Sequence, residues 1–268
     1  MAFTDFDSVA LGGKPAREFG KAATPTLVAG RPHSLFYLAG NPDAAAAPTP
    51  GLAGAALTAY AGQLPYNNPT SGLECRIARL QAGATIAGQL LLCDRLWHNS
   101  GFTITSTSAQ TVNSAAFPAR DDNGSTDGVG VLVGVEVSAA TGAGTPTLTL
   151  GYTSSDNTAG RTATNYIATA ATSAAGAFYP IGLQGSDGGV RSIQTFTLSA
   201  TWTSGTIHLV AYRVLARLEL LAANTPNAID PLTGLLQRAY DNTVPFLVFI
   251  PSTTTASNVS GHVIWTHG

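Results

Sequence analysis

The stretch VRSIQTFTLSATWTSGTIHLVAYRVLARLELL, residues 190–221, decides the fold class of this chain. Residues 193–199 alternate between two sets of side chains, and the β-branched and aromatic residues among them fit the pleated surface of a strand. The turn residues 203–205 (TSG) separate this run from a second one, residues 207–221. Two such runs joined by a short glycine-containing turn predict a β-hairpin. Its second arm is longer than an average strand, so we expect a bulge or bend near Arg213.

Further short runs with strand character lie on both sides of this stretch. The run 129–138 (VGVLVGVEVS) is almost continuously apolar, which is typical of a strand covered on both faces, and Gly128, Gly130 and Gly134 in and before it indicate close packing in a sheet. The polar stretch 154–165 (SSDNTAGRTATN) interrupts the pattern. The other expected strands are residues 31–38, 75–80, 88–97, 102–112, 145–153, 178–184, 244–250 and 258–265. Many short strands with intervening turns predict a mainly all-β chain with a jelly-roll or β-sandwich body.

The chain is expected to consist of an N-terminal arm with a short helix, residues 1–70, and the β body, residues 71–268. Residues 1–40 have no sustained period of 2 or 3.6, so they carry anchoring side chains without a core of their own. A tail wrapped on its own domain and a tail that reaches a neighbouring subunit are the two interpretations. The residues of this arm expected to contact a partner are Phe3, Phe6, Lys14, Arg17, Phe19 and Lys21.

Two short helices are predicted from capping signals. Thr49 followed by Pro50 indicates a helix over residues 50–61. Asp230 followed by Pro231 indicates a second helix, on which Leu232, Leu235, Leu236 and Ala239 share one face.

The composition is poor in charge. Asp, Glu, Lys and Arg make up 10% of the chain, against about 25% in ordinary globular proteins. A surface with so little charge tends to associate, so we expect much of it to be buried in an oligomer or a larger assembly. The net charge of −2 argues against a dominant nucleic-acid surface, and no run reaches the ~18 apolar residues that a membrane span needs. The N-terminus does not resemble a secretory signal, which favours reduced, packed thiols at Cys75 and Cys93, although a bridge between them is compatible with the sequence.

No catalytic or cofactor motif is present in the sequence. It contains no G-x-S-x-G, G-x-G-x-x-G or Walker A pattern, and its five histidines are not spaced as metal ligands. His208 is expected to point outward from its strand. The segment DRLWHNSG, residues 94–101, forms the most prominent polar group, with Asp94, Arg95 and His98 near Trp97; an active site and a structural Asp–Arg pair beneath the Trp are the two interpretations. We expect no catalytic residue and no cofactor.

One loop is a weak candidate for a metal site. The segment FPARDDNGSTDG, residues 117–128, offers Asp121, Asp122, Asn123 and Asp127, and calcium prefers carboxylate and carbonyl oxygens. The spacing is not that of an EF-hand, because position 12 counted from Asp121 is Leu132. A solvated connection between strands is the alternative.

Three stretches resemble virion structural proteins of tailed bacteriophages. They are residues 90–114 (LLLCDRLWHNSGFTITSTSAQTVNS), residues 117–165 (the acidic loop, the apolar run and the polar stretch) and residues 190–220. The resemblance implies a component of the virion, on its head, and carries no functional residue with it.

Composition and resemblance together lead to one expected function. We expect a non-enzymatic capsid decoration (cement) protein, a homotrimer located in the virion, whose arm contacts the major capsid protein and which has no membrane or direct nucleic-acid role. The alternatives are a tail, baseplate or host-adsorption component, and, more remotely, a virion-associated protein that binds or cleaves glycans. A glycan hydrolase would need paired carboxylates at a cleft, whereas the acids of this chain are few and mostly in loops.

Overall fold

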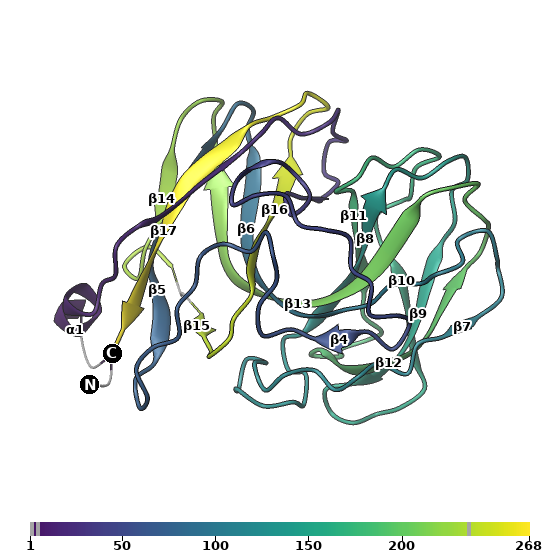
Figure 1. The fold of residues 1–268 in the computed structure, drawn as a ribbon, viewed down its shortest axis with the longest axis horizontal. Coiled ribbons are helices and arrows are strands. Elements are labelled where there is room, and N and C mark those ends of the chain that lie inside the picture. The colour runs from purple at the N-terminus through teal and green to yellow at the C-terminus, as the bar shows by residue number, and fades with distance from the viewer. Residues whose placement is uncertain (1–2, 4–5, 235–236) are drawn as a thin grey trace. The chain divides into compact units, whose positions relative to one another are not determined.

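The computed structural model describes residue 3, residues 6–234 and residues 237–268 (Figure 1). Strands hold 41% of the residues and helix 2%, so the prediction of an all-β chain is confirmed, and the large antiparallel sheets are consistent with a β-sandwich or jelly-roll type body. The chain divides into two compact units, each with its own hydrophobic core. Unit 1 comprises residues 1–45, 58–94 and 214–268; unit 2 comprises residues 46–57 and 95–213. This division does not coincide with the expected boundary near residue 70.

The elements follow in chain order. They are α1 (Phe6–Leu11), β1 (Arg17–Lys21), β2 (His33–Ser34), β3 (Gly40–Asn41), β4 (Ala55–Ala56), β5 (Cys75–Ala84), β6 (Gly88–His98), β7 (Gln110–Thr111), β8 (Leu132–Ala139), β9 (Leu148–Ser154), β10 (Arg161–Asn165), β11 (Phe178–Gly182), β12 (Val190–Leu198), β13 (Thr206–Leu220), β14 (Asn227–Ile229), β15 (Arg238–Ala239), β16 (Pro245–Pro251) and β17 (Val259–His267).

Unit 1 is built on an antiparallel sheet with the strand order β14, β5, β17, β1, β3, in which β15 also pairs with β5. Within the same unit, β16 pairs with β2 and with β6. The side chains of β5 alternate between buried and partly exposed, so one face of the sheet supplies the core with Ile77 and Leu80. Val263 of β17 and Phe249 of β16 belong to the same core.

The N-terminal segment forms part of unit 1. Strand β1 pairs with β17 from Arg17 opposite Val263 to Lys21 opposite Val259. Phe19 is 3% exposed in the core. The Lys21 ammonium donates to the carbonyls of Leu38 at 3.2 Å and Pro42 at 2.6 Å. The segment is therefore extended, as predicted, but it lies within the sheet and does not reach away from the body.

Unit 2 contains a longer antiparallel sheet, in the order β13, β8, β11, β10, β9, β12, β7, which curls around its core (Figure 1). Trp97, Tyr152, Phe196 and Trp202 are among the fully buried side chains of that core. Strand β8 is buried on both faces, as the apolar run predicts. A Cβ at Gly134 would lie 2.3 Å from the ring of Phe178, which confirms that this glycine permits close packing.

The predicted hairpin of residues 190–221 is wrong, although both of its strands exist. Strand β12 pairs with β9 and β7, whereas β13 pairs with β8. The link between them is not a tight turn, because it places Trp202 in the core, where the indole Nε1–H donates to the Ala170 carbonyl at 3.1 Å. Against β8, β13 has a register shift between Thr206 and Ile207, and this pairing ends at Tyr212. The bulge or bend expected near Arg213 stays a prediction.

Neither capping signal starts a helix. Within residues 50–61 the structure has turns and the short strand β4, because Gly51 and Gly54 adopt φ of +84° and +66°, which a helix does not accommodate. Residues 231–234 form a turn in which the Asp230 carboxylate accepts from the amides of Leu232 and Thr233. Residues 235 and 236 lie outside the described residues, and Ala239 is in β15.

Other strand predictions differ in extent. The expected strand at residues 102–112 is reduced to the two residues of β7, and the one at 31–38 to the two residues of β2. The polar stretch 154–165 contains β10, which the sequence did not predict. In the described residues, no helix is long and apolar enough to cross a membrane.

Candidate functional site

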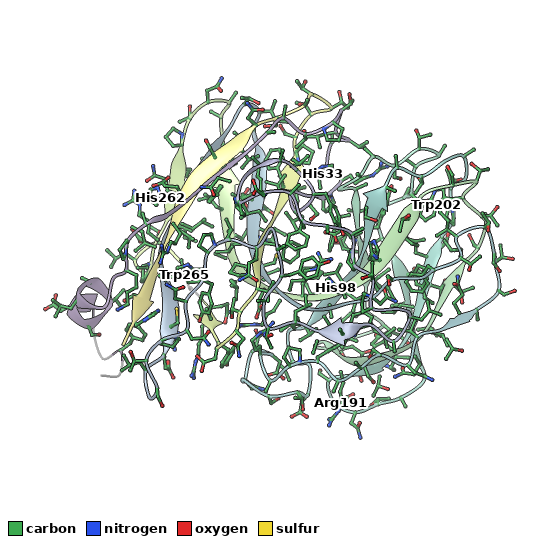
Figure 2. The ribbon with its side chains drawn as sticks, in the orientation of Figure 1. His33, His98, Arg191, Trp202, His262 and Trp265 are labelled. Atoms are coloured by element: carbon green, nitrogen blue, oxygen red, sulfur yellow. The ribbon has the colours of Figure 1, made fainter. Side chains whose placement is uncertain are left out.

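The most extensive polar arrangement lies inside unit 2. We call it the buried polar cluster, and its members come from the end of β6, from β8 and from β13 (Figure 2 labels His98). They are Arg95, His98, Asn99, Glu136, Ser138 and His208. All but the partly exposed Ser138 are buried, with exposed fractions of 2% or less.

An ion pair forms the centre of the cluster. Arg95 Nη2 donates to Glu136 Oε2 at 2.7 Å, and both side chains are fully buried. Glu136 lies directly opposite His208 in the pairing of β8 with β13. Charges removed from water are expensive unless they are paired and hydrogen-bonded, so this ion pair fixes how β6 and β8 are placed within unit 2.

The hydrogen bonds identify the tautomers of the two histidines. Arg95 Nε–H donates to His98 Nδ1 at 3.1 Å, so that nitrogen carries no proton. His208 Nδ1 lies 2.8 Å from the Asn99 carbonyl, which can only accept, so this nitrogen carries the proton. His208 Nε2 therefore accepts from the Ser138 hydroxyl at 2.7 Å.

Both rings are held neutral by their surroundings. Burial, followed by the positive charge of Arg95 and the proximity of His208, lowers the pKa of His98 to about 2. Burial also lowers the pKa of His208, although the Asn99 carbonyl and Glu136 oppose that change. A neutral imidazole is able to accept a proton, and the ring of His208 is hydrogen-bonded to the Ser138 hydroxyl.

Ser138, His208 and the Asn99 carbonyl resemble the nucleophile, base and orienting group of acyl-transfer enzymes. Such enzymes also need preorganised donors for the oxyanion. Here the Val137 amide, next to Ser138, donates to the Ala177 carbonyl at 2.9 Å, and it is therefore already used within the sheet. The His208 ring is fully enclosed. We interpret the pair as a structural link between β8 and β13.

The remaining members of the DRLWHNSG segment are also used internally. Asp94, in unit 1, accepts from the Val244 amide at 2.9 Å and is fully buried. In unit 2, the Trp97 indole donates to the Ala53 carbonyl at 3.1 Å. Arg95 forms its ion pair with Glu136. The structural Asp–Arg pair beneath the Trp stays a prediction.

The acidic loop is organised by Asp121, which is 1% exposed. Its carboxylate accepts from the amides of Asn123, Ser125, Gly128 and Val129 and from the Ser125 hydroxyl, at 2.7–3.1 Å. Burial acts to raise the pKa of Asp121, but the hydrogen bonds from Ser125, Val129 and Asn123 outweigh it, and the pKa lies below its usual value. The two carboxylate oxygens of Asp121 already accept these five hydrogen bonds, so they are not free to bind a metal ion.

The other acids of the loop point to different partners. Asp122 lies 3.5 Å from the guanidinium of the buried Arg213, and Asp127 pairs with Arg191 at 3.0 Å. In the part of the chain that the structure describes, no group of three or more His, Cys, Asp or Glu side chains is arranged to hold a metal ion. The proposed ligands Asp121, Asp122, Asn123 and Asp127 therefore do not converge.

The expected partner contacts separate into two groups. Phe19 and Lys21 are buried in unit 1. Lys14 is exposed and Arg17 partly so. Phe3 lies near Arg76, whose guanidinium is 6.0 Å from the ring centroid, and the side chain of Phe6 lies outside the described ones.

The cysteines are free thiols in the interior of unit 1. Burial raises the pKa of Cys75 to about 11 and raises that of Cys93 as well. Thiols with raised pKa values are poor nucleophiles at neutral pH. The expectation of packed, reduced cysteines is consistent with this geometry.

Sequence reasoning missed Glu136, Ser138, Asn99 and Arg120 as functional or structural polar residues. Arg120 donates to the carbonyls of Leu57 at 2.7 Å and Arg95 at 3.2 Å, and it is 3% exposed. A usable signal existed: Glu136 is the single charge of the apolar run 129–138, and Arg95 lies in another apolar run, next to Asp94. Charges in buried strands must find partners, so these two residues are natural candidates for each other.

Comparison with known proteins adds no identification: no protein-family model matches the chain, and no curated protein matches it.

Proposed function

We propose that this chain is a non-enzymatic structural protein of a bacteriophage virion, a decoration (cement) protein that stabilises the capsid through contacts between subunits. The observation that carries the proposal is the location of the charged side chains. In the described residues, seven of them are buried: Lys21, Asp94, Arg95, Arg120, Asp121, Glu136 and Arg213.

This distribution leaves the surface with even less charge than the composition implies. Ser, Thr, Asn, Gly and Ala dominate what remains. In unit 1 the apolar side chains of Leu11, Leu221 and Leu232 are exposed by 86%, 80% and 74%. Each square ångström of apolar surface that neighbours remove from water contributes about 25 cal/mol. A surface of this kind supports a protein whose task is to bury area against copies and neighbours.

The candidate chemistry in the chain supports the same conclusion. The polar groups that an enzyme would present to a substrate are engaged inside the units: His208 and His98 in the buried polar cluster, and Asp121 in its own loop. The mechanism we propose is mechanical, in that added interface raises the free energy needed to remove a subunit.

Two measurements test the location. Counting copies per particle of the source phage should give hundreds, as for a shell component; a few to a few dozen copies would instead indicate the tail or a vertex. A cryo-EM map of the particle should place the chain on the outer surface of the capsid.

Point variants test the contact surface better than removal of the N-terminal segment. Deleting residues 1–40 would remove Phe19, Leu35 and Phe36 from the core, so loss of binding after that deletion would report unfolding. We expect Leu11→Ser with Leu232→Ser to weaken binding to capsids that lack the protein by at least tenfold, at an unchanged Tm. Arg191→Gln, at an exposed position of unit 2, is the control and should bind normally.

Enzymatic activity is tested at Ser138. A fluorophosphonate probe should not label the folded protein. Labelling that disappears in Ser138→Ala would overturn the non-enzymatic assignment.

A further inference from the structure

A pocket of about 320 Å³ opens in unit 1 where the segment that precedes β1 runs beside the end of β17. Its lining residues are Lys14, Pro15, Arg17, Asn67, Asn68, Trp265 and His267. The backbone fixes these positions: the Lys14 amide donates to the Trp265 carbonyl at 2.8 Å, and the His267 amide donates to the Gly12 carbonyl at 3.0 Å. Figure 2 labels Trp265 on β17.

The lining of the pocket contains the cationic side chains of Lys14 and Arg17 and no carboxylate side chain. Within the described residues, the Lys14 ammonium makes no hydrogen bond or ion pair. The Arg17 guanidinium has one partner, the side-chain oxygen of Asn67, which accepts from Nη2 at 3.0 Å when that amide is oriented toward it. Burial and then the positive charge of Lys14 lower the pKa of His267, which also lines the pocket.

An unpartnered donor provides a second, independent observation. Trp265 is 3% exposed, and its indole Nε1–H is buried without an acceptor among the described residues. The ring is held in place by an edge-on contact with Tyr66, at 5.1 Å between centroids. A buried N–H donor without an acceptor is rare in folded proteins, and Trp265 belongs to the lining of this pocket.

We propose that this pocket binds a carboxylate, with Lys14 and Arg17 as its charged donors and the Trp265 indole N–H as a neutral one. Arginine suits the planar two-oxygen geometry of a carboxylate, and charge-assisted hydrogen bonds are the stronger ones. The ring of Pro15 and the indole give the pocket apolar walls, which fit the methylene groups of a glutamate side chain better than they fit inorganic phosphate.

The proposal does not depend on the capsid assignment. If the chain decorates a shell, the pocket selects an acidic side chain on a neighbouring protein. If it does not, a free carboxylate is the other source of the same chemistry.

Nuclear magnetic resonance of the full chain tests the site through its indole signals. The chain has three tryptophans, so Trp265→Phe assigns the resonance of interest. The protein is titrated with N-acetyl-glutamic acid amide, with its uncharged glutamine analogue, with sodium acetate and with inorganic phosphate, at constant ionic strength. We expect a saturable shift of the Trp265 signal with the glutamate compound and none with the glutamine analogue.

Comparing the glutamate compound with acetate distinguishes an acidic side chain of a protein from a free carboxylate as the ligand. Tighter binding of the glutamate compound than of acetate identifies a side chain as the ligand, and equal binding identifies a free carboxylate; both support the site. Phosphate saturating the shift at lower concentration than either carboxylate would overturn the choice of ligand.

Variants test which residues bind. Lys14→Gln with Arg17→Gln should weaken binding at least tenfold, whereas Arg79→Gln with Arg191→Gln removes the same charge elsewhere and should leave it unchanged. An unchanged titration in the first double variant, or no saturable shift in the natural sequence, would overturn the proposal. Because this test uses the isolated chain, its failure leaves the particle-based tests of the proposed function unaffected.

Discussion

Single charged residues determine much of the interior of unit 2. Arg95 and Glu136 are both fully buried in the core, where the dielectric constant is low, and they form an ion pair at 2.7 Å. Removing one member of such a pair leaves the other charge uncompensated, which costs far more than the intact pair contributes.

Replacing Glu136 by Gln should therefore destabilise the protein by about 3–5 kcal/mol. The measurement is the free energy of unfolding in urea. Asp127→Asn is the matched control, since it breaks the Arg191–Asp127 pair, whose side chains are 38% and 51% exposed. That change should cost about 1 kcal/mol or less. Equal losses in the two variants would show that the Arg95–Glu136 pair is not energetically special.

Burial of His98 should make the free energy of unfolding depend on pH. His98 has a folded-state pKa of about 2, below its unfolded value of about 6.5. The unfolded chain therefore binds more protons between these two values, and stability falls as the pH falls below about 6.5.

His98→Gln should flatten this response, because glutamine does not titrate. Between pH 6 and pH 4 the natural sequence should lose stability more steeply than the variant, by up to about 1.4 kcal/mol per pH unit. Urea unfolding at several pH values measures the difference. Parallel curves would mean that the pKa of His98 is not lowered in the folded protein.

At the scale of elements, alternation located most strands but could not assign their partners. The runs at residues 75–80, 88–97 and 244–250 correspond to β5, β6 and β16. Alternation is a local property, whereas pairing depends on residues far along the chain, so β12 and β13 were joined in a hairpin that does not exist. The helices at residues 50 and 230 failed for a related reason, since capping chemistry serves turns as well as helices.

The candidate site was located in part. The segment DRLWHNSG was recognised as polar and does enter the buried polar cluster through Arg95, His98 and Asn99. Its partners Glu136, Ser138 and His208 come from β8 and β13, and only the sheet pairing brings them together. The sequence predicts that His208 points outward from its strand, whereas residues 207–213 are buried on both faces.

The link between β12 and β13 should behave as core. Trp202 is fully buried there, so Trp202→Ala should cost about 3–5 kcal/mol in urea unfolding. Leu221→Ala removes an apolar side chain that is 80% exposed and should change stability by less than about 0.5 kcal/mol. A small loss at Trp202 would indicate that the link is only loosely packed.

For the molecule as a whole, the scarcity of surface charge has a consequence in solution. We expect the purified chain to associate into a homotrimer, because the neutral surface and its exposed leucines are more stable when covered. Light scattering coupled to size exclusion should give three times the mass of one chain. A monomer at micromolar concentration would contradict the trimer. It would mean that the chain associates only when it is bound to the particle.

The sheet of unit 1 also constrains the order of events during synthesis. Strand β5 pairs with β17 from Cys75 opposite His267 to Ala84 opposite Val259, and β1 pairs with the same strand. The central strand of this sheet, β17, is thus synthesised after both strands with which it pairs. Until it emerges, β1 and β5 present unpaired edges, and closing the sheet spans nearly two hundred residues, which makes folding slow.

A chain that ends before Val259 should consequently be unable to complete unit 1. Removing residues 259–268 should yield an aggregating product in expression trials, whereas the full chain should refold from urea without partners. A nascent chain interrupted before Val259 therefore contains β1 and β5 but lacks β17, the strand that joins them.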